Sequence, residues 1–228
     1  VKAFICTQDL KDEEYINSHY VIMATKKGQV KKTPLEQYSR PRTNGINAIT
    51  IREDDELLEA KLTTGNSQVM LAVKSGKAIR FEEEKTRPMG RNASGVRGIT
   101  LGNEKDEVVG MIAVDDGDSE ILVVSENGYG KRSSIEDYRI TNRGGKGVKT
   151  INITEKTGKL VAIKNVTDDD DLMIINKSGI AIRMAVANLR VMGRATQGVR
   201  LIKVREDDAI AAVAKAMKDD DDEVEIID

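Results

Sequence analysis

VIMATKKGQVKKT (21–33) is the first of four copies of one pattern in this sequence. The other three copies are VMLAVKSGKAIRF (69–81), ILVVSENGYGKRS (121–133) and LMIINKSGIAIRM (172–184). Each copy is an apolar run, a short turn that ends in glycine, and a second run, which predicts a tight β-hairpin. Glycine suits such a turn because the turn requires a positive φ. The turn glycines Gly28, Gly76, Gly128 and Gly179 are 48, 52 and 51 residues apart, so the sequence repeats about every 50 residues.

A second pattern follows each hairpin, and we call it the glycine box. The four boxes are RTNGINAITI (42–51), RNASGVRGITL (91–101), RGGKGVKTINI (143–153) and RATQGVRLIKV (194–204). A further apolar run closes each unit: ELLEAKL (56–62), EVVGMIAV (107–114), KLVAIKNV (159–166) and AIAAVAKA (209–216). The last of these is compatible with a helix when taken alone, and its place in the repeat favours a strand. With box and closing run as third and fourth strands, the sequence predicts an all-β, propeller-like fold of four-stranded blades.

The repeat also predicts the boundaries within the chain. We expect one β region over residues 1–218, with blades at about 20–62, 68–114, 120–166 and 171–217. Residues 1–7 (VKAFICT) match a closing strand whose unit lacks its first three strands. We therefore expect either a blade completed by strand exchange or, preferably, a fragment of a longer array. Residues 219–228 hold seven acids and no base, a block that we expect to be a disordered tail.

Composition excludes several classes of protein. The 228 residues contain one cysteine, Cys6, and one histidine, His19, which argues against a disulfide scaffold and against zinc or multi-histidine metal sites. No apolar run approaches the length of about 20 residues that a transmembrane helix needs. No nucleotide-binding glycine loop and no set of nucleophile, base and orienting group is visible. We therefore expect a soluble, cytosolic chain without metal, cofactor or catalytic residues.

Basic residues recur at fixed places in every unit. The tail holds seven of the 38 acids, so the rest of the chain has 36 bases against 31 acids and is mildly basic. Bases follow the turn glycines at Lys32, Arg80, Arg132 and Arg183, with Lys31 and Lys131 beside two of them. Each box opens with an arginine, and a second base follows the glycine of three boxes. The opening arginines are Arg42, Arg91, Arg143 and Arg194, and the second bases, two residues after the box glycine, are Arg97, Lys149 and Arg200. In the first box Asn47 stands in place of this second base.

Equivalent positions of successive blades repeat in space, so we expect these bases to form a basic stripe along one rim. Such a stripe suits the phosphates of duplex DNA, and the absence of accompanying aromatic residues argues against single-strand binding. In the third box, Gly144, Gly145 and Gly147 would bring backbone N–H groups close to phosphate, with charge from Arg143, Lys146 and Lys149. The alternatives are solubilising edge charges and a loop that is merely flexible and basic. The tail, with Asp219, Asp220, Asp221, Asp222 and Glu223, is expected either to compete with phosphate for these bases or to be only solubilising.

The hairpins and the pattern R-x-x-x-G-[VI]-[RK] resemble the C-terminal DNA-wrapping domain of the bacterial DNA gyrase A protein. VRGITLG (96–102), NGYGKR (127–132) and GRATQGVR (193–200) carry this resemblance, which covers essentially the whole chain, and the acidic end also fits. The family's hallmark Q-R-R-G-G-K-G does not occur here. The nearest string is NRGGKG (142–147), in which Asn142 replaces an arginine.

The resemblance implies a β-pinwheel, in which neighbouring blades exchange strands and positively charged outer faces bind, bend and wrap duplex DNA. It implies a non-catalytic module that gives chirality to negative supercoiling, while the catalytic tyrosine and the ATP and Mg²⁺ sites of an ATP-dependent type II topoisomerase lie outside this chain. The implied partners are duplex DNA, the N-terminal core of the gyrase A protein, and the gyrase B protein in an A2B2 holoenzyme. This holoenzyme would lie in the bacterial cytoplasm, associated with the nucleoid and not with a membrane. The related domain of topoisomerase IV and a propeller that binds other proteins are the alternatives.

Overall fold

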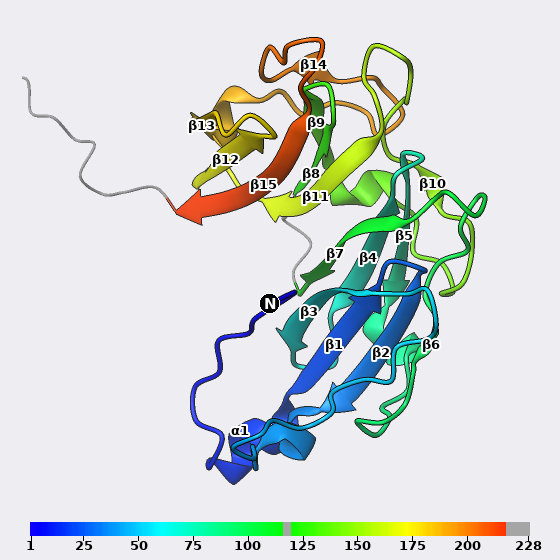
Figure 1. Cartoon of the computed structure of the whole chain (residues 1–228), viewed down its shortest axis with the longest axis vertical. Coiled ribbons are helices and arrows are strands. Elements are labelled where there is room, and N and C mark those ends of the chain that lie inside the picture. Colours follow the sequence, from blue (N-terminus) through cyan, green and yellow to red (C-terminus); the bar gives the residue numbers. More distant parts are fainter. Residues whose placement is uncertain (116–119, 218–228) are drawn as a thin grey trace, which may run out of the picture.

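The computed structural model describes residues 1–115 and 120–217, and its strands form four antiparallel sheets (Figure 1). Each unit supplies a hairpin and a closing strand. The first two units supply β1 (Tyr20–Thr25), β2 (Gln29–Pro34) and β3 (Leu57–Thr63), then β4 (Gln68–Val73), β5 (Lys77–Glu82) and β7 (Val108–Val114). The last two supply β8 (Glu120–Ser125), β9 (Tyr129–Ser134) and β11 (Leu160–Val166), then β12 (Asp170–Asn176), β13 (Ala181–Ala185) and β15 (Ile210–Met217). The predicted tail at 219–228 lies outside the described residues.

The four predicted hairpins form, and their turns explain the spacing of the glycines. Gly28, Gly76, Gly128 and Gly179 have φ values of 82°, 80°, 79° and 87°, in the left-handed region that favours glycine. In every sheet the closing strand pairs with the first strand of its own hairpin. The run at 209–216, which alone is compatible with a helix, is strand β15, as its place in the repeat predicted.

Neighbouring units exchange their third strands, which confirms the pinwheel arrangement. Strand β6 (Val96–Arg97) of the second unit pairs with β2 of the first, and β10 (Val148–Lys149) pairs with β5. Strand β14 (Val199–Arg200) pairs with β9 in the same way. A sheet is therefore not one continuous stretch of sequence, because its outermost strand belongs to the following unit.

Two expected strands do not form, and the fourth sheet has three strands instead of four. The box at 42–51 contains no strand, because the described residues include no hairpin of a preceding unit and the free outer edge of β13 does not pair with this box. Residues 1–7 also contain no strand, so the expectation of a closing strand there is wrong. The sheet of β12, β13 and β15 lacks an outer strand because no further box follows β13 and β15 within residues 1–217.

The closing strands and the exchanged strands occupy opposite edges of the sheets. Strands β3, β7, β11 and β15 contact one another in that order. In Figure 1 the exchanged strands β6, β10 and β14 follow one another on the other side, along the right and the top of the view. We call that side the outer edge. The apolar core lies in layers between successive sheets, and the box isoleucines Ile99 and Ile151 are buried in two of these layers.

Short helical turns connect the second hairpin strand of each unit to its box. They are the 3-10 turns η1 (Leu35–Tyr38), η2 (Glu83–Lys85), η3 (Ile135–Asp137) and η4 (Val186–Asn188). Helix α1 (Glu13–Ser18) precedes the first sheet, and the Asp12 side chain caps it by accepting from the N–H groups of Glu14 and Tyr15. None of the helices in the described part of the chain has the length and apolar character that crossing a membrane requires.

Candidate nucleic-acid interface

The bases that follow the turn glycines are buried between blades, which corrects the expected exposed stripe. Lys32, Arg80 and Arg132 are 4%, 5% and 8% exposed. They lie on the second hairpin strands, next to the outermost strand of each sheet, where the following unit covers them. Arg183, at the same position of the fourth sheet, is exposed and pairs with Asp171 at 2.7 Å.

Each buried base reaches the 3-10 turn of the following unit. Lys32 Nζ lies 3.1 Å from Glu83 Oε1, at the start of η2. Arg80 Nη1 donates to the carbonyl oxygens of Ile135 (2.7 Å) and Tyr138 (2.9 Å), around η3. Arg132 Nε donates to Leu189 O at 2.6 Å, just after η4. These contacts, which we call the joints, hold one sheet to the next.

Lys31 and Lys131 are also inside the molecule, with side chains that are 0% exposed. Lys31 Nζ donates to Ala48 O and Arg91 O, and Lys131 Nζ donates to Gly193 O, so both hold box loops in place. The pKa of each lysine is lowered from 10.5 to about 8, mainly by burial, with the charge of nearby Arg91 as the second cause at Lys31. Five of the predicted DNA-contacting bases are thus buried and bound to partners within the protein.

The arginines that open the boxes connect each box to the preceding one. Arg143 Nη1 donates to Arg97 O at 2.9 Å, and Arg194 Nη1 donates to Lys149 O at 2.8 Å. Arg91 Nη1 makes the same contact with Asn47 O at 3.1 Å. The accepting residue is always two positions after the box glycine. The box arginines therefore fix the spacing of these positions along the outer edge.

The residues two positions after the box glycine form the exposed part of the predicted site. Arg97, Lys149 and Arg200 end the exchanged strands β6, β10 and β14, and all three are exposed. Lys149 Nζ makes a 3.3 Å contact with Asn152 Oδ1, and Arg200 Nη2 donates to the Tyr129 hydroxyl at 2.9 Å. The Arg200 contact is the main cause that lowers the pKa of Tyr129. One base per exchanged strand thus lies on the outer edge.

The glycines of the third box serve the strand exchange first. Gly147 has φ of 70°, and a Cβ there would lie 2.5 Å from Ala78 O on the neighbouring strand. The equivalent glycines of the second and fourth boxes approach a backbone oxygen as closely, at 2.6 and 2.5 Å. The N–H of Gly144 donates to Gly98 O at 2.6 Å, so it is not available to a phosphate. Gly145 and Lys146 are exposed beside these positions, which leaves Lys146 as the accessible charge of this loop.

Sequence reasoning missed a further set of periodic bases. Arg87, Arg139 and Arg190 follow the 3-10 turns at spacings of 52 and 51 residues, the same period as the hairpins. All three are exposed, and their side chains have no hydrogen bond or ion pair to the described residues. Their spacing was visible in the sequence, and extending the search to the segment before each box would have found them.

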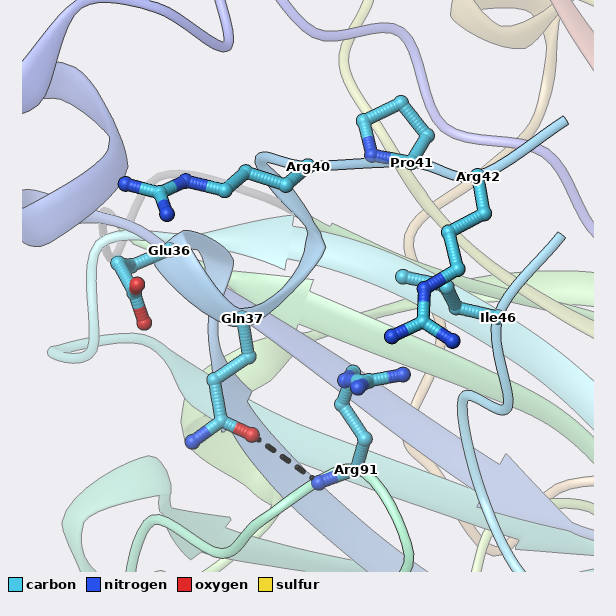
Figure 2. A pocket seen from close by; sticks show the side chains of 7 residues that line it. All are labelled: Glu36, Gln37, Arg40, Pro41, Arg42, Ile46 and Arg91. Carbon is cyan, nitrogen blue, oxygen red and sulfur yellow. Dashed lines mark hydrogen bonds between the residues drawn. The ribbon is translucent and has the colours of Figure 1, made fainter.

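An arginine-lined hollow of about 710 Å³ lies beside the first box. Arg42 and Arg91, both predicted site residues, line it together with Arg40, Glu36 and Gln37. Figure 2 shows the guanidinium groups of Arg42 and Arg91 pointing toward one another, and Arg40 extending on the other side toward Glu36. Across the described part of the chain, no group of three His, Cys, Asp or Glu side chains is placed to hold a metal ion.

Comparisons with known proteins agree with this architecture. The family model described as DNA gyrase C-terminal domain, beta-propeller, matches residues 19–64, 68–115, 119–167 and 170–217. The A protein of DNA gyrase from Staphylococcus aureus strain MRSA252 is 46% identical over 226 residues, which is 99% of this chain and 25% of that protein. The same protein of strain NCTC 8325 is 46% identical over 224 residues, or 98% of this chain and 25% of the relative. The chain thus spans about a quarter of the length of these relatives.

Solved structures share the fold. The C-terminal domain of DNA topoisomerase IV superposes with a TM-score of 0.83 at 23% identity, covering 88% of this chain and 62% of that one. The DNA gyrase A C-terminal domain gives a TM-score of 0.78 at 24% identity, covering 87% and 66%. Four matches of the family model, one for each repeat unit, establish that the chain belongs to the DNA gyrase C-terminal domain, beta-propeller, family.

Proposed function

We propose that this chain binds duplex DNA along its outer edge and bends it, as a non-catalytic module of a gyrase-type topoisomerase. The observation that carries the proposal is the exposed base at the end of each exchanged strand: Arg97, Lys149 and Arg200. Box arginines hold the first two of these positions, through Arg97 O and Lys149 O, and such a repeated arrangement suits the regular phosphates of a duplex. Arg42, Lys146, Arg87, Arg139 and Arg190 add exposed positive charge near the boxes.

We expect the DNA to bend because several blades contact its backbone at the same time. Bending a site of 20–30 base pairs by 40–90° costs roughly 1–6 kcal/mol, which a single exposed base does not offset. Three blades that each hold the backbone divide this cost among them. Because phosphates carry no base code, the affinity should depend strongly on salt and little on DNA sequence.

Two triple variants test the proposal with equal changes in charge. Arg97→Gln/Lys149→Gln/Arg200→Gln removes the outer-edge bases. Its matched control, Lys61→Gln/Lys164→Gln/Lys215→Gln, removes three lysines from the closing strands on the opposite edge. Binding of a fluorescent duplex is measured by anisotropy over a range of salt, and the fold by circular dichroism.

We expect the outer-edge variant to lower the slope of log affinity against log salt by about 2–3, at about 0.9 per lost phosphate contact. The control should keep the wild-type slope. Fluorescence transfer between the ends of a duplex of about 40 base pairs should fall only in the outer-edge variant. Equal effects of the two variants, or no binding of the wild type at low salt, would contradict the proposal.

The longer relatives suggest the assembly in which this module works. The relatives at 46% identity are A proteins of DNA gyrase, about four times as long as this chain. We infer that the remainder of such an A protein and the gyrase B protein are its partners in an A2B2 enzyme of the bacterial cytoplasm, near the nucleoid. The catalytic tyrosine, ATP and Mg²⁺ would act in those other parts, with no cofactor or metal in this chain. A test is whether this chain restores supercoiling when fused to a gyrase A core that lacks this region.

Topoisomerase IV remains the second candidate because its C-terminal domain superposes with the higher TM-score. The 46% identity to gyrase proteins favours the gyrase assignment, since the superposed structures are below 25% identical and show the fold alone. The resemblance to the gyrase domain implies wrapping, so wrapping tests the gyrase assignment. Closing nicked plasmid in the presence of the chain should shift the linking number of the product if DNA is wrapped with one hand, and should leave it unchanged otherwise.

The acidic residues at 219–228 fit a regulatory role in the same binding. Their seven carboxylates carry the charge sign of phosphate and would compete with it for the outer-edge bases. Deleting residues 219–228 should therefore tighten DNA binding, most at low salt where screening is weak. Equal binding by the truncated and intact chains at low salt would show that the tail only solubilises.

A further inference from the structure

The outer edge has one gap, at the first unit. The position that carries Arg97, Lys149 or Arg200 in the later units is occupied by Asn47 in the first box. The box arginine Arg91 still holds its carbonyl, at 3.1 Å from Nη1 to Asn47 O. The carbonyl at this position is therefore held as in the later units, although the first box forms no strand, and the exposed cation is missing.

The arginine-lined hollow lies next to this gap. Its lining includes Arg40, Arg42 and Arg91, against one carboxylate from Glu36. Neither the Arg40 nor the Arg42 side chain has a hydrogen bond or ion pair to the described residues, and both residues are exposed. Two guanidinium groups that face one another, as those of Arg42 and Arg91 do in Figure 2, repel unless an anion lies between them.

Arg91 also differs from the other box arginines in a way that frees part of its guanidinium. Arg143 Nε donates to Lys85 O and Arg194 Nε donates to Asp137 O, both at 2.9 Å. Arg91 Nε has no such acceptor among the described residues, and Gln37 Oε1 accepts from its backbone N–H instead at 3.1 Å. The Nε edge of Arg91 is thus left to bind a ligand.

We propose that Arg40, Arg42 and Arg91 form a clamp for one phosphate group of the bound duplex, which replaces the cation that Asn47 lacks. Planar guanidinium groups suit this role because each can donate two parallel hydrogen bonds to phosphate oxygens. This proposal rests on the proposed DNA-binding function. It adds one further phosphate contact, in the hollow beside the first box. A phosphate diester of DNA and a free phosphate ion share this chemistry, so the test must separate them.

The test uses Arg40→Gln/Arg42→Gln, which changes two exposed residues and leaves the backbone contact of Arg91 in place. The matched control is Lys61→Gln/Lys164→Gln, with the same loss of charge from the opposite edge. Duplex binding is measured over a range of salt for the wild type and both variants. Binding of inorganic phosphate to the wild type and to the clamp variant is measured by calorimetry, and Arg42→Glu alone serves as a second variant.

If the clamp binds DNA, Arg40→Gln/Arg42→Gln should bind duplex about tenfold more weakly at low salt, and its slope of log affinity against log salt should be lower by about 1. Arg42→Glu should bind more weakly still. The control should match the wild type. Inorganic phosphate should not bind the wild type measurably at millimolar concentration. If the wild type binds duplex and the clamp variant has the same slope, the clamp is refuted and the outer-edge function stands. Saturable phosphate binding that the variant loses, with no change in DNA slope, would instead identify a site for free anions. A wild type that does not bind duplex at all refutes both proposals.

Discussion

The bases of the joints and the bases of the outer edge share one repeat period but lie in opposite surroundings. Arg80 is enclosed by the next unit and donates to two backbone carbonyls, whereas the Arg97 side chain is exposed and donates to none of the described residues. In the joints, the charge satisfies acceptors that the protein itself leaves open at its 3-10 turns. Losing a joint base should therefore reduce stability, and losing an outer-edge base should reduce binding.

The largest effect on stability is expected at the first joint. Lys32→Met leaves Glu83 buried without its cation, and breaking a buried pair from one side costs about 3–5 kcal/mol. Urea denaturation followed by circular dichroism measures this loss in the free energy of unfolding. The matched outer-edge variant, Arg97→Met, should change that free energy by less than about 0.5 kcal/mol.

A second variant shows whether the unpaired carboxylate causes the loss. Lys32→Met/Glu83→Gln removes both charges and should recover more than half of the lost stability, because the amide oxygen still accepts from the Ser67 N–H while the amide NH2 donates to the Thr63 hydroxyl oxygen. If Lys32→Met lowers the free energy of unfolding by less than about 1 kcal/mol, the joint bases do not differ from the outer-edge bases in their effect on stability.

The second joint should show a somewhat smaller effect, because its buried acceptors are neutral and its one carboxylate partner, Glu136, is exposed. Arg80→Met leaves the carbonyl oxygens of Ile135 and Tyr138 without these donors, which we expect to cost about 2–4 kcal/mol. Arg183→Met is the matched control at the same position of the fourth sheet, where the side chain is exposed and pairs with Asp171. It should cost less than about 1 kcal/mol. Similar losses for the two variants, measured by denaturation, would count against the joint.

Two glycines sharpen the comparison at the strand exchange. Gly147 and Gly45 have φ values of 70° and 77°, but only Gly147 is close to another strand, at Ala78 O. Both alanine variants carry the backbone strain, while Gly147→Ala also clashes. We expect Gly147→Ala to be less stable than Gly45→Ala by about 1–3 kcal/mol. If the two variants melt at the same temperature, the close approach is not what requires glycine.

The smallest expected effect is a dependence of stability on pH. Lys31 and Lys131 have a folded-state pKa of about 8 against 10.5 for an exposed lysine. Between these values the unfolded chain binds more protons than the folded chain, so the free energy of unfolding rises with pH above about 8. Below that range both states are protonated and this contribution is constant.

The measurement is the melting temperature between about pH 8 and about pH 9.5. The upper limit avoids the buried Tyr138, whose raised pKa adds a contribution of its own at higher pH. Over this pH range we expect the melting temperature of the wild type to rise by a few degrees, at about 2–4 °C per kcal/mol of added stability. The melting temperature of Lys31→Met/Lys131→Met should rise less. A double variant with the same pH profile as the wild type would show that these lysines do not titrate in this range.

The repeat period was enough to predict the hairpins, the closing strands and the outer-edge bases. Glycine spacing is reliable here because the backbone itself imposes it, at the turns by positive φ and in the boxes by the close approach of Gly147 to Ala78 O. The period did not distinguish buried from exposed bases. Lys31 and Lys32 are consecutive, so alternation along a strand places them on opposite faces, and one of them is normally exposed. Both are buried, because the box loops cover one face and η2 covers the other.

The acidic turns show the same limit of sequence reasoning. Acidic residues gather before the closing runs of the first, second and fourth units, among them Asp55, Asp106 and Asp208, and this pattern predicts solvated turns away from the DNA-contacting bases. In the structure these three aspartates accept from the backbone N–H groups of Lys27, Ser75 and Ser178 and so hold the hairpin turns. Such capping depends on a contact between segments about 30 residues apart, and no local pattern encodes it.

Because of strand exchange, one repeat of the sequence does not correspond to one sheet of the structure. Residues 1–101 contain every strand of the first sheet, but they also contain the β4–β5 hairpin of the second sheet without β7 and β10. Any cut of the chain between two units therefore leaves one sheet without its outermost strand. By contrast, inserting one full repeat length of about 50 residues adds one complete sheet, whichever residue of the repeat the inserted segment begins with. Such a fold can therefore grow by whole repeat lengths, but cutting out one sequence unit never removes exactly one sheet.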